Sequence, residues 1–179
     1  MANSRAVFLD RDGVLIRALV RGGRPYPPTR MEDVELLSGS LRSLKNLAEA
    51  GYILIGITNQ PDVARGTQSR EGVEEINAWI QNRLPISEIF VCYHDTADNC
   101  SCRKPKPGLI FQAALKYALD LTQSWMVGDR WKDIGAGYAA GLKTIFVDYH
   151  YSEPFEGAPA THSVKDTEFL ADIILKGST

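Results

Sequence analysis

Residues 6–14 read AVFLDRDGV, an apolar run that ends at two acidic residues. The first four residues predict a short buried strand of a parallel sheet. Asp10 and Asp12 follow at once, and Gly13 lets the backbone turn sharply after the strand. Open α/β sheets bind ligands at the carboxyl ends of their strands, so the two acids are placed for a site. An ordinary acidic turn is the alternative, although neighbouring carboxylates repel each other unless a cation lies between them.

Apolar runs alternate with helical patterns along the rest of the chain. Strands are expected at residues 52–60, 86–91, 125–129 and 144–147, and helices at residues 39–50, 70–83, 108–119, 131–140 and 167–175. This alternation predicts an α/β fold with a doubly wound, mostly parallel sheet and right-handed crossovers. Residues 16–33, rich in Arg, Gly and Pro, are expected to form a flap with little regular structure. Residues 149–163 are expected to form a second loop.

The composition is that of an ordinary soluble protein, with 44% hydrophobic and 23% charged residues. A chain of 179 residues fits one domain, residues 1–179, and the intervals between its motifs leave no stretch for a cap domain. The net charge of −2 favours neither nucleic acid nor an anionic membrane surface. No apolar signal region or membrane-length run is visible. We therefore expect a cytoplasmic monomer that acts on a small molecule.

Chemically reactive side chains recur at the predicted strand ends. Asp10, Thr58, Cys92 and Asp129 each lie at or just after the carboxyl end of a strand. These ends share one edge of a parallel sheet, which predicts a single active site there.

Four aspartates supply hard oxygen ligands suited to Mg²⁺, namely Asp10, Asp12, Asp129 and Asp133. Asp129 and Asp133 are spaced i, i+4, which places both on one face of a predicted helix near its amino end. Acids there also favour the helix dipole, so a purely structural role is the alternative. Other polar residues could hold an anionic substrate: Thr58, Asn59, Arg65, Arg103, Lys104 and Arg130. For arginines on a loop, plain solvation is the common alternative.

All three cysteines fall within residues 92–102, together with one histidine. The set Cys92, His94, Cys100 and Cys102 suits a tetrahedral Zn²⁺ with no open position, which is a structural site. Zinc would hold this short polar loop in place and fix the following Arg103-Lys104 segment beside the active edge.

The ordered set of motifs resembles the haloacid dehalogenase-like (HAD-like) phosphohydrolases. The Asp-x-Asp-Gly-Val motif, a strand ending in Thr, a later Lys and Gly-Asp-x-x-x-Asp occur in this order between residues 6 and 147. The resemblance implies that Asp10 is the nucleophile of an aspartyl-phosphate mechanism and that Asp12 is the general acid and base. It places Mg²⁺ on Asp10, the Asp12 carbonyl and Asp129, with Asp133 ordering bound water. Thr58 and Lys104 would hold the phosphoryl oxygens.

The zinc loop narrows the resemblance to two families. Cys-x-His…Cys-x-Cys-Arg-Lys-Pro-x-Pro-Gly resembles the D-glycero-D-manno-heptose-1,7-bisphosphate phosphatases and the related histidinol-phosphate phosphatases. Residues 58–66 end in Ala-Arg-Gly, which is similar to the heptose enzymes. The resemblance therefore implies removal of the C7 phosphate of a heptose 1,7-bisphosphate in nucleotide-heptose biosynthesis, with histidinol phosphate as the alternative substrate.

Two other classes of function remain open from the sequence. One is a zinc-stabilised binding module that has lost catalysis, which the complete set of motif residues disfavours. The other is a phosphatase of nucleic-acid ends, which the charge of −2 and the lack of a basic-aromatic stripe disfavour.

Overall fold

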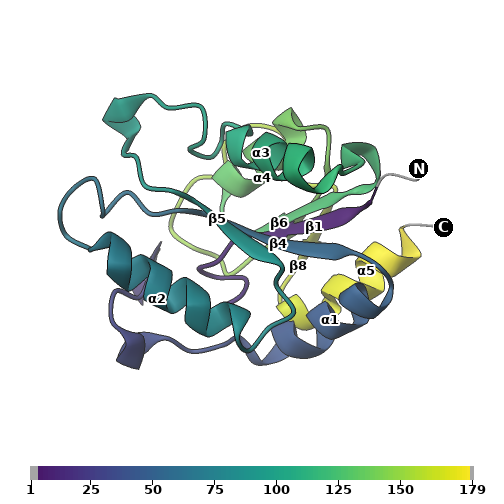
Figure 1. The fold of residues 1–179 in the computed structure, drawn as a ribbon, viewed down its shortest axis with the longest axis horizontal. Coiled ribbons are helices and arrows are strands. Elements are labelled where there is room, and N and C mark those ends of the chain that lie inside the picture. The colour runs from purple at the N-terminus through teal and green to yellow at the C-terminus, as the bar shows by residue number, and fades with distance from the viewer. Residues whose placement is uncertain (1–3, 178–179) are drawn as a thin grey trace.

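A six-stranded parallel sheet forms the centre of the molecule. The structure is a computed structural model that describes residues 4–177. Its strands are ordered β5-β4-β1-β6-β7-β8, and each neighbouring pair is parallel (Figure 1). Their bounds are β1 Ala6–Leu9, β4 Ile53–Asn59, β5 Glu88–Cys92, β6 Trp125–Gly128, β7 Lys143–Val147 and β8 His162–Val164. The chain winds outward from β1 in both directions, which confirms the predicted doubly wound sheet.

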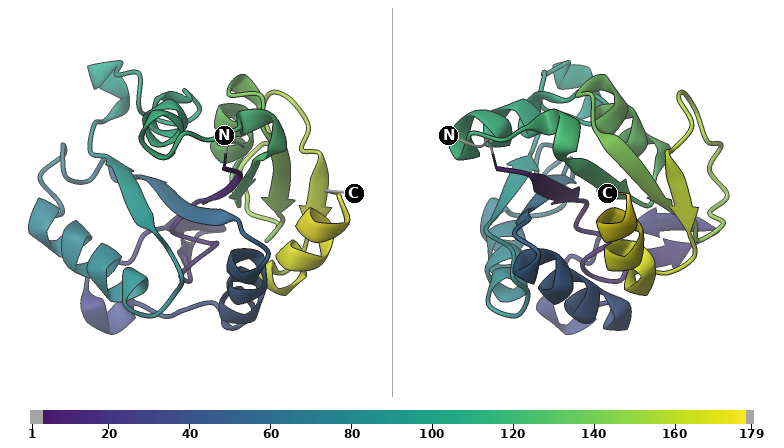
Figure 2. Two further views of the ribbon diagram at one scale, coloured as in Figure 1. Left: turned by 45° about the vertical axis from the view of Figure 1, so that its right-hand side comes forward. Right: turned by 90° about the vertical axis from the view of Figure 1, so that its right-hand side faces the viewer.

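Helices cover both faces of the sheet (Figures 1 and 2). One face carries α1 (Ser38–Glu49), α2 (Arg70–Gln81) and α5 (Leu170–Lys176), and the other carries α3 (Gly108–Tyr117) and α4 (Trp131–Ala139). Within β1, Val7 and Leu9 pack into the first core, whereas Ala6 and Phe8 pack into the second. Burial on both faces explains why β1 is a continuous apolar run rather than an alternating one.

The topology gathers the predicted reactive residues at one edge of the sheet. β1 pairs with β4 on one side and with β6 on the other. Asp10, which follows β1, therefore lies between Thr58 near the end of β4 and Asp129 just after β6. Cys92 is the last residue of β5, the next strand outward.

The flap at residues 16–33 is more ordered than the sequence suggested. β2 (Leu19–Arg21) and β3 (Arg24–Tyr26) form an antiparallel hairpin, and a 3₁₀ turn spans Met31–Asp33. The two turn residues, Gly22 and Gly23, have φ values of 57° and 76°, as the tight hairpin turn with two left-handed residues requires. The prediction of little regular structure is wrong, because strands of only three residues with Arg and Pro among them leave no periodic signal.

A second correction concerns the loop expected at residues 149–163. Its last two residues belong to β8, which pairs in parallel with β7 and completes the sheet. Only Val164 of this edge strand is buried, so the strand has no apolar pattern. The closing helix begins as a 3₁₀ turn at Thr167–Phe169 and continues as α5.

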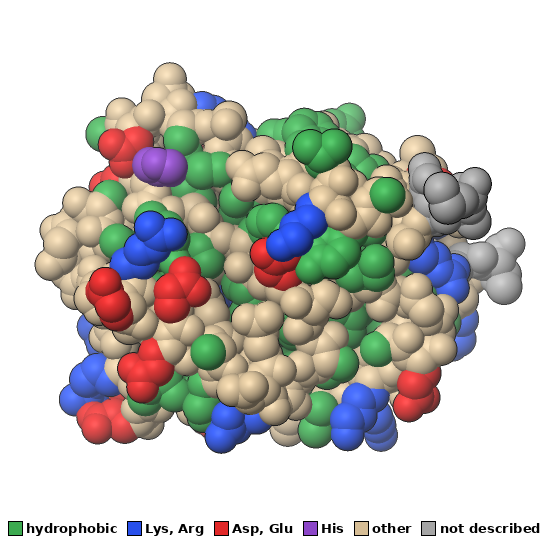
Figure 3. Space-filling view, viewed as in Figure 1, with side chains coloured by type: hydrophobic (Ala, Val, Ile, Leu, Met, Phe, Trp, Pro, Cys, Tyr) green, Lys and Arg blue, Asp and Glu red, His purple; other side chains and the backbone are tan. Residues whose placement is uncertain are grey.

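Residues 4–177 contain the sheet, its helices and the hairpin, with no separate cap domain. None of the helices in this range has the length and apolar character needed to cross a membrane. Acidic and basic side chains are interspersed over the face seen in Figure 3.

Candidate active site

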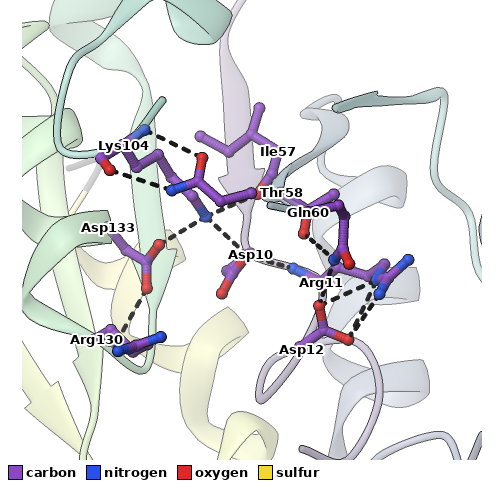
Figure 4. A network of polar contacts seen from close by, with 10 residues as sticks. Asp10, Arg11, Asp12, Ile57, Thr58, Gln60, Lys104, Arg130 and Asp133 are labelled. Atoms are coloured by element: carbon purple, nitrogen blue, oxygen red, sulfur yellow. Dashed lines mark hydrogen bonds and ion pairs between the residues drawn. The ribbon is translucent and has the colours of Figure 1, made fainter. Parts of the chain in front are cut away.

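A buried lysine joins two of the carboxylates predicted for the site. Lys104 Nζ lies 2.7 Å from Asp10 Oδ1 and 2.7 Å from Asp133 Oδ1, and it donates to the carbonyl of Ile57 at 2.9 Å (Figure 4). The Lys104 side chain is only 3% exposed. Burial alone would lower the pKa of Lys104, but the charges of Asp10 and Asp133 outweigh burial and raise it. The ammonium therefore stays charged beside Asp10.

Asp129 completes a cluster of carboxylates that fits a metal ion. One oxygen each of Asp10, Asp129 and Asp133 can lie within 4.8 Å of the others. Both carboxylate oxygens of Asp129 are buried and make no hydrogen bond of good geometry among the described residues, although the Tyr151 hydroxyl lies close enough to interact with this carboxylate. Burial, together with the charges of Asp10 and Asp133, raises the pKa of Asp129 well above its usual value. Three clustered carboxylates, of which Asp129 keeps both oxygens free of a good hydrogen bond to the described residues, are a donor set suited to Mg²⁺.

Gly13 makes this cluster possible by its lack of a side chain. Its φ is +98°, and a Cβ atom at this position would lie 2.0 Å from Asp129 Oδ2. No other residue could therefore occupy position 13 without displacing the Asp129 carboxylate.

Asp133 has the structural role that the sequence left open as an alternative, and it also pairs with Lys104. Its Oδ2 accepts a hydrogen bond from the Arg130 backbone N–H at 3.0 Å, which caps the start of α4, while Oδ1 pairs with Lys104. Burial and the charge of Asp10, opposed by Lys104, raise the pKa of Asp133 to about 6. Asp129 itself lies outside the helix, since α4 begins at Trp131. The expectation that both acids share one helix face is wrong for Asp129.

Asp12 points away from this cluster and toward a different set of partners (Figure 4). Its carboxylate accepts hydrogen bonds from the buried guanidinium of Arg11 at 3.1–3.2 Å and from Gln60 Nε2 at 2.8 Å. The Asp12 carboxylate is absent from the metal-type cluster, so any contribution of this residue to the metal would come through its backbone. Burial, opposed by Arg11, raises the pKa of Asp12.

A small pocket of about 70 Å³ opens onto these residues. Asp10, Asp12, Thr58 and Lys104 line it together with the flap. Asn59 also lines it, but its side chain is committed to the loop: Asn59 donates to the Lys104 carbonyl and accepts from the Lys104 N–H, both at 3.1 Å. Asn59 therefore positions Lys104.

A wider cleft of about 680 Å³ continues outward from the pocket. The three predicted arginines, Arg65, Arg103 and Arg130, all line it. Arg65 forms a bidentate pair with Asp95 at 2.7 Å, and Arg130 forms one with Glu153.

Within residues 4–177, two basic residues of this cleft, Arg103 and Lys132, form no bidentate pair with a carboxylate of the kind that Arg65 and Arg130 form. Arg103 donates to the carbonyl of His94 at 3.2 Å. Lys132 lines both the pocket and the cleft. Burial and the charges of Arg130 and Arg103 lower the pKa of Lys132, which indicates a locally positive field.

The four predicted zinc ligands converge. The three sulfur atoms of Cys92, Cys100 and Cys102 lie 3.2–3.7 Å from one another, and His94 Nδ1 lies 3.3 Å from Cys102 Sγ and 3.7 Å from Cys92 Sγ. Zinc–sulfur bonds of about 2.3 Å in a tetrahedron give separations of this size. The cluster can hold Zn²⁺ with all four positions filled, which suits a structural role.

Several residues of the site were not identified from the sequence. Arg11 and Gln60 contact Asp12. Glu153 holds Arg130, and Asp95 holds Arg65. Lys132 lines both the pocket and the cleft. Arg11 would ordinarily be taken for a solvated charge between two acids, but its side chain is fully buried. The contacts of Gln60 and Glu153 depend on tertiary structure alone, and nothing in the local sequence signals them.

The fold and the site together define a phosphatase of the HAD-like hydrolases. Aspartates follow β1 and β6, Thr58 lies near the end of β4, and the buried Lys104 precedes α3, all on one sheet edge. A family model described as HAD-hydrolase-like matches residues 101–167.

Comparison with individual proteins shows to which family of HAD-like phosphatases the chain belongs. The D-glycero-alpha-D-manno-heptose-1,7-bisphosphate 7-phosphatase of Photorhabdus laumondii is 36% identical over 169 residues, covering 86% of this chain and 89% of that protein. The D-glycero-beta-D-manno-heptose-1,7-bisphosphate 7-phosphatase of Helicobacter pylori is also 36% identical and covers 97% and 99%. The chain belongs to this family of heptose-bisphosphate phosphatases, which confirms the family resemblance drawn from the motifs.

A solved structure agrees with this assignment. The D,D-heptose 1,7-bisphosphate phosphatase from B. bronchiseptica, complexed with magnesium and phosphate, aligns with a TM-score of 0.82 at 27% identity. The alignment covers 97% of this chain and 99% of that one.

Proposed function

We propose that this protein removes the C7 phosphate of a D-glycero-D-manno-heptose 1,7-bisphosphate through a phosphorylated Asp10. The observation that carries the proposal is the placement of Asp10 2.7 Å from the Lys104 ammonium in the lining of a pocket, in a chain that belongs to the heptose-bisphosphate phosphatase family. This reaction would serve the synthesis of nucleotide-activated heptose.

In this proposal the side chains of the chain divide the work. Asp10 attacks the phosphorus atom, and the bond to the sugar oxygen breaks. Asp12 donates a proton to that leaving oxygen, and it later takes a proton from the water that hydrolyses the aspartyl phosphate. Lys104 and the Thr58 hydroxyl hold the phosphoryl oxygens.

Asp10 and Asp129, with the Asp12 backbone carbonyl, would hold Mg²⁺, and Asp133 would order water beside it. When bound, Mg²⁺ supplies positive charge that offsets the negative charge of the phosphoryl group and of the three carboxylates. The neighbour from B. bronchiseptica was solved with magnesium and phosphate, which supports this choice of metal. Zn²⁺ on the four ligands at residues 92–102 would be structural.

The basic groups of the outer cleft support a substrate with a second phosphate. Arg103 and Lys132 are the best placed, because Arg65 and Arg130 already pair with carboxylates. A histidinol phosphate would instead present an amine to this positive region. The structure therefore favours the bisphosphate among the two substrates that the motifs allowed.

The test is phosphate release with Mg²⁺ from both anomers of heptose 1,7-bisphosphate and from histidinol phosphate. We expect kcat/KM to be far higher for one heptose anomer than for histidinol phosphate. A preference for histidinol phosphate would overturn the substrate and leave the mechanism standing. Release from none of the three would favour the inactive zinc-stabilised module.

A further inference from the structure

The side chain of Asp12 is held by a network of hydrogen bonds. The roles proposed for Asp10, Asp12, Thr58 and Lys104 do not explain this network. Arg11 is fully buried, and its Nε and Nη2 atoms donate to the Asp12 carboxylate at 3.1–3.2 Å (Figure 4). Its remaining Nη1 donates to Asn77 Oδ1 on α2 at 3.1 Å. The guanidinium therefore links Asp12 to α2. Two of its nitrogen atoms, Nε and Nη2, donate to the same carboxylate.

Gln60 holds the same carboxylate from the other side. Its Nε2 donates to Asp12 Oδ2 at 2.8 Å and to Thr58 Oγ1 at 2.9 Å, and the residue is 2% exposed. The backbone N–H of Gln60 donates to the carbonyl of Cys92 at 2.7 Å, so the residue is fixed to the end of β5. Because Thr58 Oγ1 accepts a bond from Gln60, its own hydroxyl hydrogen stays available for a phosphoryl oxygen.

These contacts restrict where the Asp12 carboxylate can go. Asp12 lines the pocket beside Asp10 and Thr58, yet it follows the end of β1 and lies in a turn. A side chain there would sample several rotamers without partners. General acid catalysis requires the acid within hydrogen-bond reach of the leaving oxygen, and a misplacement of about 1 Å costs about 100-fold in rate.

We propose that Arg11 and Gln60 are positioning residues that hold Asp12 at the leaving-group side of the pocket. This inference rests on the proposed role of Asp12 as the general acid. Arg11 acts from the α2 side through its paired donors, and Gln60 acts from the β4–β5 edge. Neither residue touches the reacting atoms, so each affects the rate only through Asp12, apart from the contact of Gln60 with Thr58.

Leaving-group dependence separates this role from a structural one. A sugar alkoxide needs a proton to leave, whereas p-nitrophenolate leaves without one. The experiment compares kcat/KM for heptose 1,7-bisphosphate and for p-nitrophenyl phosphate in the Mg²⁺-loaded protein. kcat/KM covers the steps through departure of the leaving group, so slow hydrolysis of the aspartyl phosphate does not enter.

The variants are Gln60→Met, which keeps the volume and removes the donors, and Arg11→Lys, which keeps the charge and removes the fork. We expect each to lower kcat/KM for the bisphosphate about tenfold or more while p-nitrophenyl phosphate changes about threefold or less. Gln81→Met, at an exposed position of α2, is the matched control and should change neither. Thermal unfolding and zinc content verify that the variants fold.

Asp12→Asn, measured in parallel, distinguishes the possible failures. Suppose that Asp12→Asn lowers kcat/KM for the bisphosphate much more than for p-nitrophenyl phosphate. The positioning role is then overturned if Gln60→Met and Arg11→Lys lower kcat/KM equally for both substrates, or for neither. If Asp12→Asn shows no leaving-group selectivity, the general-acid assignment fails and the positioning role fails with it. Wild-type protein inactive on the bisphosphate but active on p-nitrophenyl phosphate would instead overturn the proposed substrate.

Discussion

At the scale of single residues, two features shape the active edge: a glycine without space for a side chain, and a lysine that is almost fully buried. Gly13 lies against Asp129, and Lys104 lies between Asp10 and Asp133. Asp10, Asp12, Thr58 and Asp129 could be predicted from the sequence because each lies at a strand end. The buried contacts of Arg11 and Gln60 could not, because they join residues from separate elements.

Gly13→Ala should damage the metal cluster. The added Cβ would lie 2.0 Å from Asp129 Oδ2, and the alanine would have to adopt a φ of +98°. We expect kcat/KM to fall about 100-fold and the Mg²⁺ concentration needed for half-maximal activity to rise. Gly141→Ala is the matched control, since its φ is +76° and open space surrounds it. If both variants needed the same Mg²⁺ concentration for half-maximal activity, the close contact between position 13 and the Asp129 carboxylate would be unimportant.

Lys104→Met should destabilise the protein as well as inactivate it. Removing one partner of a buried ion pair costs about 3–5 kcal/mol, and here two carboxylates would lose their partner. The free energy of unfolding, measured with denaturant, gives this cost. Lys116→Met is the comparison, because Lys116 and Glu88 form an exposed pair whose loss is expected to change stability little. Equal losses in the two variants would contradict the buried network.

At the scale of elements, two irregular segments shape the site around the regular sheet. The zinc loop leads from β5 to Lys104, and the hairpin β2–β3 lines the pocket through Pro25, Tyr26 and Pro27. The sequence showed the ligand spacing of the loop, because four ligands within residues 92–102 are a strong signal. It did not show the hairpin, whose strands are too short and too polar for a period-2 pattern.

Cys100→Ser should release zinc and lower stability without changing the Mg²⁺ requirement. None of residues 93–103 is fully buried, so we expect the order of this loop to depend on the metal. A loss of about 2 kcal/mol would lower the melting temperature by about 4–8 °C. Metal analysis and thermal unfolding measure both effects, with Ser101→Ala as the neighbouring control. Full zinc occupancy in Cys100→Ser would refute the ligand assignment.

Gly23→Ala should shift the hairpin. Gly23 accepts a hydrogen bond from the Ser152 N–H at 2.8 Å, and an added Cβ would lie 2.4 Å from Ser152 Oγ. We expect KM for the bisphosphate to rise several-fold while kcat stays near its wild-type value, because the hairpin lines the pocket and carries none of the proposed catalytic groups. Gly22→Ala, in the same turn with open space around it, should have a smaller effect. A fall in kcat at constant KM would contradict this role.

At the scale of the whole molecule, the sheet order explains how distant motifs form one site. The central strands were predictable because burial on both faces makes them continuous apolar runs, and their carboxyl ends necessarily share an edge. β8 was not predictable, since His162 and Ser163 are exposed on an edge strand. Three carboxylates at the shared edge face one buried ammonium, so the fold concentrates negative charge there.

Magnesium should therefore stabilise the folded protein. A ligand that binds only the folded state adds about 2.7 kcal/mol when its concentration is 100 times its dissociation constant. We expect Mg²⁺ to raise the melting temperature of the wild type. In Asp129→Asn the gain should vanish, and the metal-free variant should melt above the metal-free wild type, because a buried unpaired carboxylate is removed. A wild-type melting temperature unaffected by Mg²⁺ would contradict the metal site.

The most direct test of the account is phosphate release from heptose 1,7-bisphosphate by Asp10→Asn in the presence of Mg²⁺. Asp10 is the residue at which the sheet, the lysine and the carboxylate cluster meet. We predict that release is abolished while the variant keeps its zinc and its cooperative thermal unfolding. Continued release by the folded variant would show that Asp10 does not accept the phosphoryl group, and the proposed mechanism would fail.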